Sequence, residues 1–93
     1  MRNATICQAI ENRQILSFIY DGTPREVEPH AHGEDAHGDS SLRAYLVSGI
    51  SQGWRMFHTD KMFGLSALQE TFLNPRPGYK RNDSNLRVIH CQL

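Results

Sequence analysis

Hydrophobic and polar positions follow two different periods along the chain, and the first is helical. In residues 4–13, apolar residues such as Ile6 and Ile10 recur on one face at the spacing of an α-helix. Asn3 or Thr5 can cap the start of this helix, because a short polar side chain there accepts a hydrogen bond from a free backbone N–H. The pattern predicts a short amphipathic helix at the beginning of the chain.

From residue 14 onward the pattern becomes that of extended chain. Residues 14–20 (QILSFIY) are rich in β-branched and aromatic residues, and the DGTP that begins at residue 21 is typical of a turn. Further strands are predicted at 25–29 (REVEP), 42–50 (LRAYLVSGI), 54–59 (WRMFHT) and 86–93 (LRVIHCQL).

The remaining segments are predicted as loops, with one left open. Residues 30–41 (HAHGEDAHGDSS) have no apolar period and predict a loop, and the prolines and glycine of residues 74–85 predict another. Residues 61–72 (KMFGLSALQETF) fit either a strand or a helical turn.

These elements indicate one mainly β domain over residues 1–93, with a helix at about 4–13. About five short strands, and no second helix long enough for a parallel crossover, favour a small antiparallel barrel of the Sm or SH3 type over residues 14–93. The residues expected in the core or in a pocket wall are Leu16, Phe18, Tyr20, Val27, Tyr45, Val47, Phe57 and Leu65.

Composition adds expectations about the compartment and the assembly. Cys7 and Cys91 have no zinc-type spacing, and two cysteines do not make a disulfide framework, so we expect free thiols in a reducing cytoplasm. No apolar run approaches the roughly 20 residues of a membrane span. A barrel of 93 residues has a thin core and open strand edges, and we therefore expect a homodimer.

The net charge is zero, but the charges are unevenly distributed. Residues 21–39 hold six acids and one base, whereas residues 40–81 hold six bases and two acids. Such a division either places one basic face on a neutral molecule or lets acids and bases pair across the surface.

The predicted strand 54–59 and the residues directly after it hold side chains that could bind an anion. Arg55, His58 and Lys61 follow one another at intervals of three, and Tyr45 lies on the neighbouring predicted strand. Arginine with an aromatic ring suits a phosphate and a base. The alternative, which the pattern alone favours, is that the aromatic side chains belong to the core and the cations to its rim.

A metal centre is the competing hypothesis. His30, His32 and His37 lie among Glu34, Asp35 and Asp39, and a His-x-His pair on extended chain points both rings to one side. The Gly-rich segment and its many carboxylates favour solvation over a closed metal shell. No nucleotide-binding or nucleophile motif occurs, so we expect a protein without enzymatic activity and without a cofactor.

Five short motifs in order resemble the WYL domain. They are LSFIYDGTPREVEPHAHG, LRAYLVSG, WRMFHTDKMFGL, ETFLNPRPGY and the helix before them. The Trp-Tyr-Leu triplet of that family stands here as Ala44-Tyr45-Leu46, and its Phe-Arg-x-Asp-Arg-Ile motif as residues 57–62, FHTDKM. Lysine and histidine replace arginine there, so bidentate recognition of phosphate is weakened at those positions.

The resemblance implies an Sm-like sensor domain that binds a negatively charged ligand, either a nucleotide or short single-stranded nucleic acid. Such domains act in transcriptional and phage-defence or CRISPR regulation in bacteria and are usually joined to a winged helix that binds DNA. The 93 residues leave no room for that helix-turn-helix, so we expect any effector or DNA-binding part to be a separate protein. An Sm-like structural or protein-interaction module, and a metal-dependent hydrolase built on the three histidines, remain alternatives. The residues carried over from the family are Arg25, Tyr45, Arg55, His58, Lys61 and Arg76.

Overall fold

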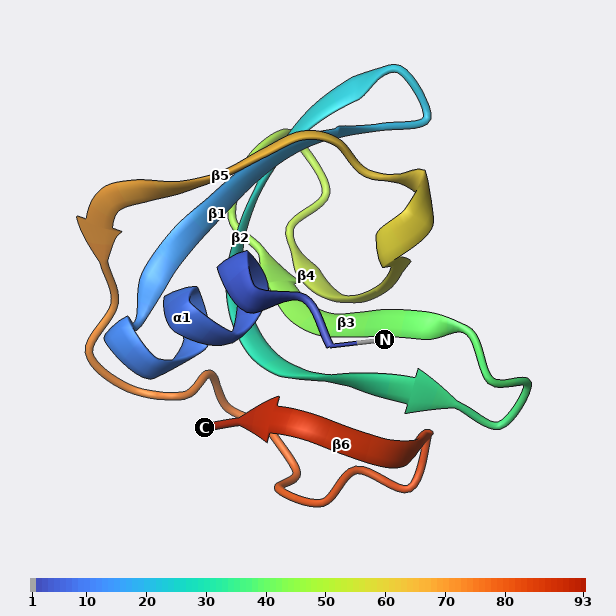
Figure 1. The fold of residues 1–93 in the computed structure, drawn as a ribbon. Coiled ribbons are helices and arrows are strands. Elements are labelled where there is room, and N and C mark those ends of the chain that lie inside the picture. Colours follow the sequence, from blue (N-terminus) through green and yellow to red (C-terminus); the bar gives the residue numbers. More distant parts are fainter. Residues whose placement is uncertain (1) are drawn as a thin grey trace.

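The fold, described here for residues 2–93 of a computed structural model, is one helix packed on an antiparallel sheet (Figure 1). The segment 61–72, left open by its sequence pattern, supplies a strand. The elements in chain order are α1 (Ala4–Asn12), β1 (Gln14–Tyr20), β2 (Thr23–Asp35), β3 (Ser40–Leu46), β4 (Gly53–His58), the 3-10 turn η1 (Thr59–Lys61), β5 (Phe63–Thr71) and β6 (Leu86–Gln92).

Helix α1 begins and ends as its sequence predicts. Of the two candidate caps, Asn3 is used: its side-chain oxygen accepts a hydrogen bond of 3.0 Å from the N–H of Ile6. The helix stops at Arg13, which adopts the left-handed conformation with φ of 53°. Ile6 and Ile10 are buried on its inner face. Within residues 2–93 no helix has the length and apolar character needed to cross a membrane.

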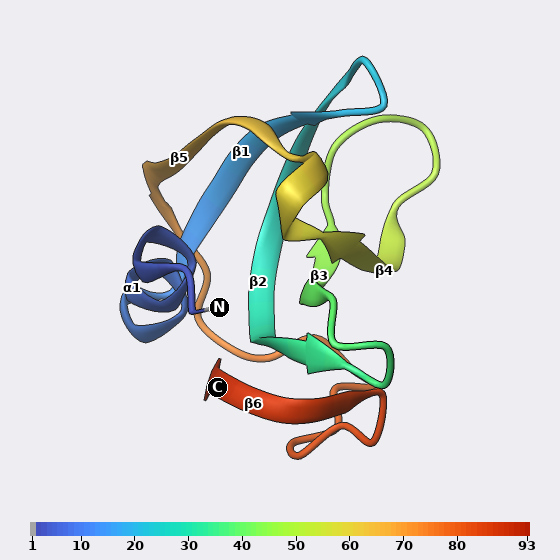
Figure 2. The same ribbon diagram turned by 45° about the vertical axis from the view of Figure 1, so that its right-hand side comes forward.

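Strand β2 is the centre of the sheet. It pairs with β1 through its first half and with β3 along much of its length, and its last residues, Ala31–Asp35, also pair with β6. A register shift between Pro29 and Ala31 bends the strand, and Figure 2 shows β6 lying beside the bent half. Every pairing in the sheet is antiparallel.

The loop predicted for residues 30–41 is therefore wrong over its first half. Residues 30–35 continue β2, and the turn is confined to the four or so residues before β3. The prediction from composition was wrong because the backbone groups of this segment are hydrogen-bonded to β3 on one side and to β6 on the other, which its own side chains do not reveal. Gly33 permits this pairing, since a Cβ at that position would overlap the carbonyl oxygen of Val88.

The sheet is open, and the expectation of a closed barrel is not met. The strand order is β4-β3-β2-β1-β5, with β6 joined to β2. After η1 the chain crosses to the far side of β1, so β5 pairs with β1 and not with β4. Among residues 2–93, β4, β5 and β6 are thus each paired on one side only, and the bent sheet has six strands, one more than predicted.

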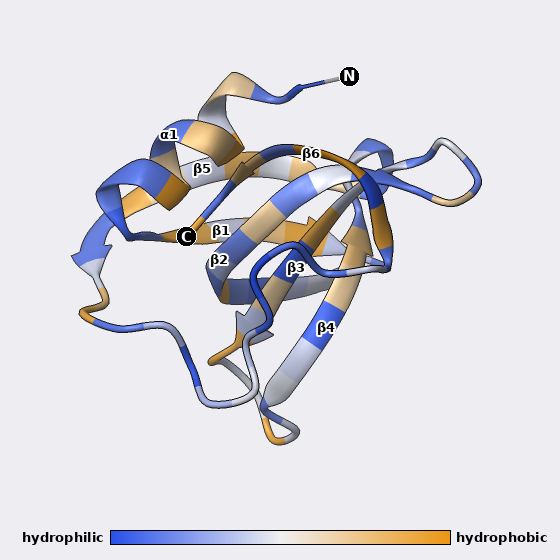
Figure 3. Ribbon diagram, turned by 90° about the horizontal axis from the view of Figure 1, so that it is seen from below, coloured by the Kyte–Doolittle hydropathy of each residue, from blue (hydrophilic) through white to orange (hydrophobic). Residues whose placement is uncertain are grey.

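The core lies between α1 and the concave side of the sheet. Hydrophobic and hydrophilic residues alternate along the strands, as Figure 3 shows, and place one side of each strand inside. Four of the eight predicted core residues are buried: Leu16, Phe18, Val27 and Phe57. Two more, Tyr20 and Leu65, are half-buried and pack against the core. The last two, Tyr45 and Val47, are half-buried outside it.

Cys7 of α1 and Cys91 of β6 form a disulfide bond, which corrects the expectation of free thiols. The pairing of β6 with β2 sets Cys91 opposite His32 and brings it beneath α1, where the two cysteine Cα atoms are 5.6 Å apart. A contact between residues 84 positions apart follows from topology and has no local sequence signature.

We expect reduction of this disulfide to lower the free energy of unfolding by about 2–5 kcal/mol, because the bond closes a long loop in the unfolded chain. Urea unfolding with and without dithiothreitol measures the effect. A Cys7→Ala/Cys91→Ala variant is the control, and its stability should not respond to reductant. Equal stability of the oxidised and reduced wild type would contradict this role.

Candidate functional site

The structure separates the six predicted site residues. Tyr45 pairs with Trp54 and buried Ala44 pairs with Arg55, so Tyr45 and Arg55 point to opposite faces of the sheet. The predicted single cluster is therefore divided among four surroundings: Arg25 with Arg55, Tyr45 with Arg76, His58 with two aspartates, and Lys61 exposed on η1.

Arg25 and Arg55 line one cleft of about 190 Å³. Its walls come from the start of β2 and from the loop between β3 and β4, which contributes Ser48 and Ser51. Within the described chain, no aspartate or glutamate lines it. The sequence had indicated both arginines but neither serine, because Ser48 was assigned to the predicted strand 42–50 and Ser51 only to the turn after it.

The Arg55 guanidinium holds the β3–β4 loop in place. One of its terminal nitrogens donates to the carbonyl of Trp54 at 2.9 Å, and the other donates to the carbonyl of Ser51 at 2.6 Å and lies 3.3 Å from the Ser51 hydroxyl. A guanidinium has five N–H donors, so at least two have no partner among residues 2–93. The loop is also tied to β2, since the N–H of Glu26 donates to the Ser48 hydroxyl at 3.0 Å.

Arg25 is only partly satisfied by its neighbours. A terminal nitrogen donates to the carbonyl of Tyr20 at 3.3 Å, and the guanidinium carbon lies 6.0 Å from the centre of the Tyr20 ring. Its Nε is buried and has no hydrogen-bond partner in the described chain. A buried donor without an acceptor costs free energy, so the Arg25 guanidinium is incompletely satisfied by the described chain.

Arg76 is already engaged by a carboxylate. Its Nε and a terminal nitrogen donate to the two oxygens of Glu28 at 2.7 and 3.1 Å, and Glu28 is only 6% exposed. The hydrogen bond to Glu28 raises the pKa of Arg76. The guanidinium also lies 4.5 Å from the centre of the Tyr45 ring. Arg76 thus forms a half-buried ion pair with Glu28 and covers the Tyr45 ring, so it leaves little free charge for a ligand.

His30 and His32 are fully buried and use both ring nitrogens. Nδ1 of His30 lies 2.8 Å from the carbonyl oxygen of Glu28, and its Nε2 accepts from the N–H of Arg76 at 3.0 Å. Nδ1 of His32 lies 2.9 Å from the carbonyl oxygen of Ser41, and its Nε2 accepts from the N–H of Asn3 at 3.0 Å. Each ring is therefore neutral, with its proton on Nδ1.

These contacts argue against the competing hypothesis of a metal centre at His30, His32 and His37. The bend of β2 turns the two buried rings toward different neighbours, His30 toward Trp54 and His32 toward His90. His37 is exposed in the turn that follows, where its backbone N–H donates to Asp35. With every nitrogen of the buried rings occupied, a metal would have to break hydrogen bonds that hold the fold.

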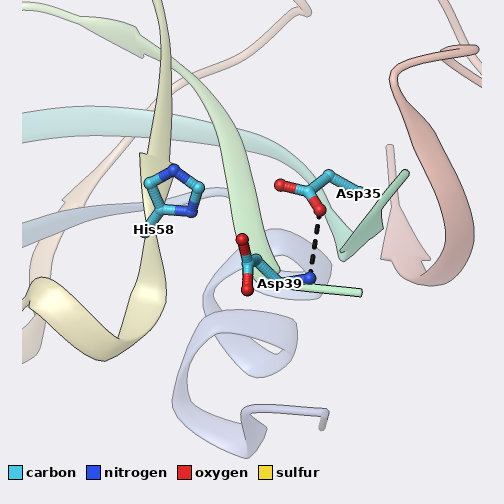
Figure 4. A group of neighbouring side chains, drawn as sticks. All are labelled: Asp35, Asp39 and His58. Carbon is cyan, nitrogen blue, oxygen red and sulfur yellow. Dashed lines mark hydrogen bonds between the residues drawn. The ribbon is translucent and has the colours of Figure 1, made fainter. Parts of the chain in front are cut away.

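A different group of donors comes together at the end of β2. Ligand atoms of Asp35, Asp39 and His58 lie within 4.8 Å of one another, and Figure 4 shows the three side chains converging. Burial alone would raise the pKa of Asp35, but the N–H groups of Asp39 and His37 donate to its carboxylate and hold that pKa below its usual range. This group is open to solvent, and Asp35 serves mainly to fasten the turn.

Comparison with known proteins does not place the chain in a family. No family model matches it, and no curated protein and no solved structure is significantly similar to it. The likeness to WYL domains therefore rests on the short motifs alone.

We expect stability to fall as the pH is lowered below about 6.5. Burial lowers the pKa of His30 and His32, so both are neutral in the folded state, whereas the unfolded chain takes up their protons near the ordinary value of about 6.5. Above that pH the buried neutral rings contribute fully to the free energy of unfolding. Below it, each histidine lowers the free energy of unfolding by up to about 1.4 kcal/mol per pH unit, until the pH reaches the pKa of that histidine in the folded state.

Urea unfolding between pH 7.5 and 5 measures this dependence. A His30→Gln variant should be less stable at neutral pH but should lose less stability on acidification than the wild type. His37→Gln removes an exposed histidine and should leave the dependence unchanged. A wild-type stability that stays flat or rises over this range would contradict the assignment of neutral buried rings.

We also expect no tightly held metal at the Asp35–Asp39–His58 group, because three solvent-open donors do not form a closed coordination shell. Dialysis against EDTA should leave the melting temperature unchanged, and elemental analysis of untreated protein should show far less than one equivalent of zinc or manganese. One equivalent of metal in the wild type that is missing from a His58→Ala variant would contradict this expectation.

Proposed function

We propose that the chain is a non-enzymatic ligand-sensing module that holds the phosphoryl group of a nucleotide, or of a short single-stranded nucleic acid, in the Arg25–Arg55 cleft. The observation that carries the proposal is a cleft with two guanidinium groups and two serine hydroxyls and with no carboxylate among the lining residues of the described chain. Excess positive charge with hydroxyl donors is the chemistry that binds phosphate.

The size of the cleft limits what can enter it. At about 190 Å³ it is smaller than a typical pocket for a whole small molecule, which is about 300–1,000 Å³. A phosphoryl group fits, and the rest of the ligand would lie outside. Arg25 reaches from β2 and Arg55 from β4, so a bound phosphate would bridge both strands and the β3–β4 loop.

That bridge suggests how binding could be sensed. Residues 47–52 connect two strands and are held by the Arg55 and Ser48 hydrogen bonds, and Ile50 at their tip is fully exposed. A phosphate shared by Arg25 and Arg55 would fix this loop relative to β2. Such a change at an exposed loop is what a regulatory partner could recognise, in keeping with the role that the WYL resemblance implies.

A protein-interaction module is the second candidate, and β5 favours it. This nine-residue edge strand is largely exposed, carries Glu70 as its one charged residue, and begins with Phe63, which is 69% exposed. Long edge strands with little charge readily pair with another chain. The expected homodimer could form through this edge, and it stays a prediction.

We expect nucleotides and short oligonucleotides to bind wild type at low salt and to bind Arg25→Gln or Arg55→Gln at least about tenfold more weakly. A hydrogen bond to a charged group contributes about 1.5–3 kcal/mol, which sets this range. Affinity should also fall by nearly one decade per decade of salt for each phosphate contact. Isothermal titration calorimetry with inorganic phosphate, mononucleotides and oligonucleotides measures all three effects.

Arg87→Gln is the matched control, because Arg87 is an exposed arginine on β6, outside the cleft. It should bind as wild type does. If wild type binds none of these ligands at low salt, or if all three variants bind equally well, the cleft is not an anion site and the protein-interaction role becomes the better explanation.

A further inference from the structure

A second cavity, on the other face of β4, is used by none of the functions above. Its volume is about 290 Å³. It lies between the strands β3 and β4 and the loop that precedes β6, and its main lining residues are Arg43, Trp54, Tyr79, Lys80, Asp83 and Asn85.

Two aromatic rings form one side of this cavity. The ring centres of Trp54 and Tyr79 are 6.3 Å apart, and their planes are 22° from parallel. Behind them lies the buried ring of His30, whose centre is 4.7 Å from that of Trp54 and 5.1 Å from that of Tyr79. The two rings are therefore supported from inside and are half-exposed toward the cavity.

The polar atoms of both rings are already bonded elsewhere. Nε1 of Trp54 donates to the carbonyl of Pro77 at 3.0 Å, and the hydroxyl of Tyr79 donates to the carbonyl of Leu93 at 3.0 Å. These bonds fix the orientation of each ring. The two rings therefore present a flat apolar surface in a fixed position. Such a surface favours a ligand with a planar ring that can stack on it.

The rest of the lining is polar and holds one unpaired cation. Arg43 Nε is bonded to the carboxylate of Asp83 at 3.2 Å, and the same carboxylate accepts from Asn85. Lys80 is exposed and makes no ion pair among residues 2–93. The cavity thus combines a stacking surface with amide and carboxylate groups that can bond the edge of a base, and with a cation at its mouth.

We infer that this cavity is a nucleobase site, in which the base of a purine nucleotide stacks on Trp54 and Tyr79 and its phosphate lies near Lys80. The volume is at the lower end of the range for ligand pockets, which suits a base-sized group. The inference does not rest on the Arg25–Arg55 cleft, because the two cavities have no lining residue in common.

Trp54 is the sole tryptophan of the chain, so its fluorescence reports on this cavity directly. We expect AMP and adenosine to quench it in a saturable way, and ribose 5-phosphate to leave it unchanged. The Lys80→Gln change should weaken the binding of AMP several-fold and leave the binding of adenosine nearly unchanged. Lys61→Gln is the control, because Lys61 is also exposed but lies on η1. Stacking of a base on one aromatic ring raises affinity by about tenfold or more, so Tyr79→Leu should bind AMP and adenosine more weakly by that factor.

Tyr79→Phe keeps the ring and should bind adenosine as wild type does, which separates stacking from the hydrogen bond of the hydroxyl. Should Tyr79→Leu fail to fold, the Lys80 and Tyr79→Phe variants still test the site. Arg25→Gln should leave quenching by adenosine unchanged, because Arg25 does not line this cavity. This variant therefore tests the proposed phosphate cleft separately from the proposed base site. No quenching by AMP or adenosine, or equal quenching by ribose 5-phosphate, would overturn the inference.

Discussion

The pairing of β2 with three other strands is the constraint on which the rest of the structure depends. β1 holds its first half, β3 runs along much of its length, and β6 joins where the strand bends. That bend requires the register shift at Pro29–Ala31, and the approach of β6 requires Gly33. Arg25, His30 and Asp35 lie at the start, middle and end of this one strand, so each candidate site inherits its position from it.

The bend also explains why two imidazoles are buried. A register shift interrupts the ladder and leaves backbone groups near it in need of partners. Nδ1 of His30 and of His32 each lies within hydrogen-bond distance of a backbone carbonyl oxygen, and each Nε2 accepts from a distant backbone N–H. One of these N–H groups belongs to Asn3, at the start of α1, and the other to Arg76, in the loop before β6. Neutral histidines thus fasten the start of α1 and the loop before β6 to the central strand, and this is a structural use of residues whose sequence pattern had suggested a metal.

Local pattern was sufficient where an element's own side chains decide its structure. The face of α1, the aromatic strand β1 and the proline-rich loop after β5 follow from residues next to one another. It was insufficient where distant segments decide. Residues 30–35 have the composition of a loop yet form a strand between two neighbours, and Cys7 meets Cys91 only because β6 returns beneath α1. The predicted single cluster of site residues was wrong because the sequence does not reveal the register between β3 and β4. In the observed register Tyr45 pairs with Trp54, so its ring cannot face the same cleft as Arg55.

The alternation of β4 then gives the two cavities a physical relation. Trp54 and Arg55 are consecutive residues, so their side chains point to opposite faces, one toward each cavity. Arg55 donates to the carbonyl of Trp54, and β4 is an edge strand that only β3 holds within the described chain. The carbonyl that accepts from Arg55 belongs to the peptide unit between these two residues, so the hydrogen bond fixes the Arg55 side chain on its own face of the strand. The two cavities are therefore neighbours along the chain, but their lining side chains lie on opposite faces of β4 and none is shared.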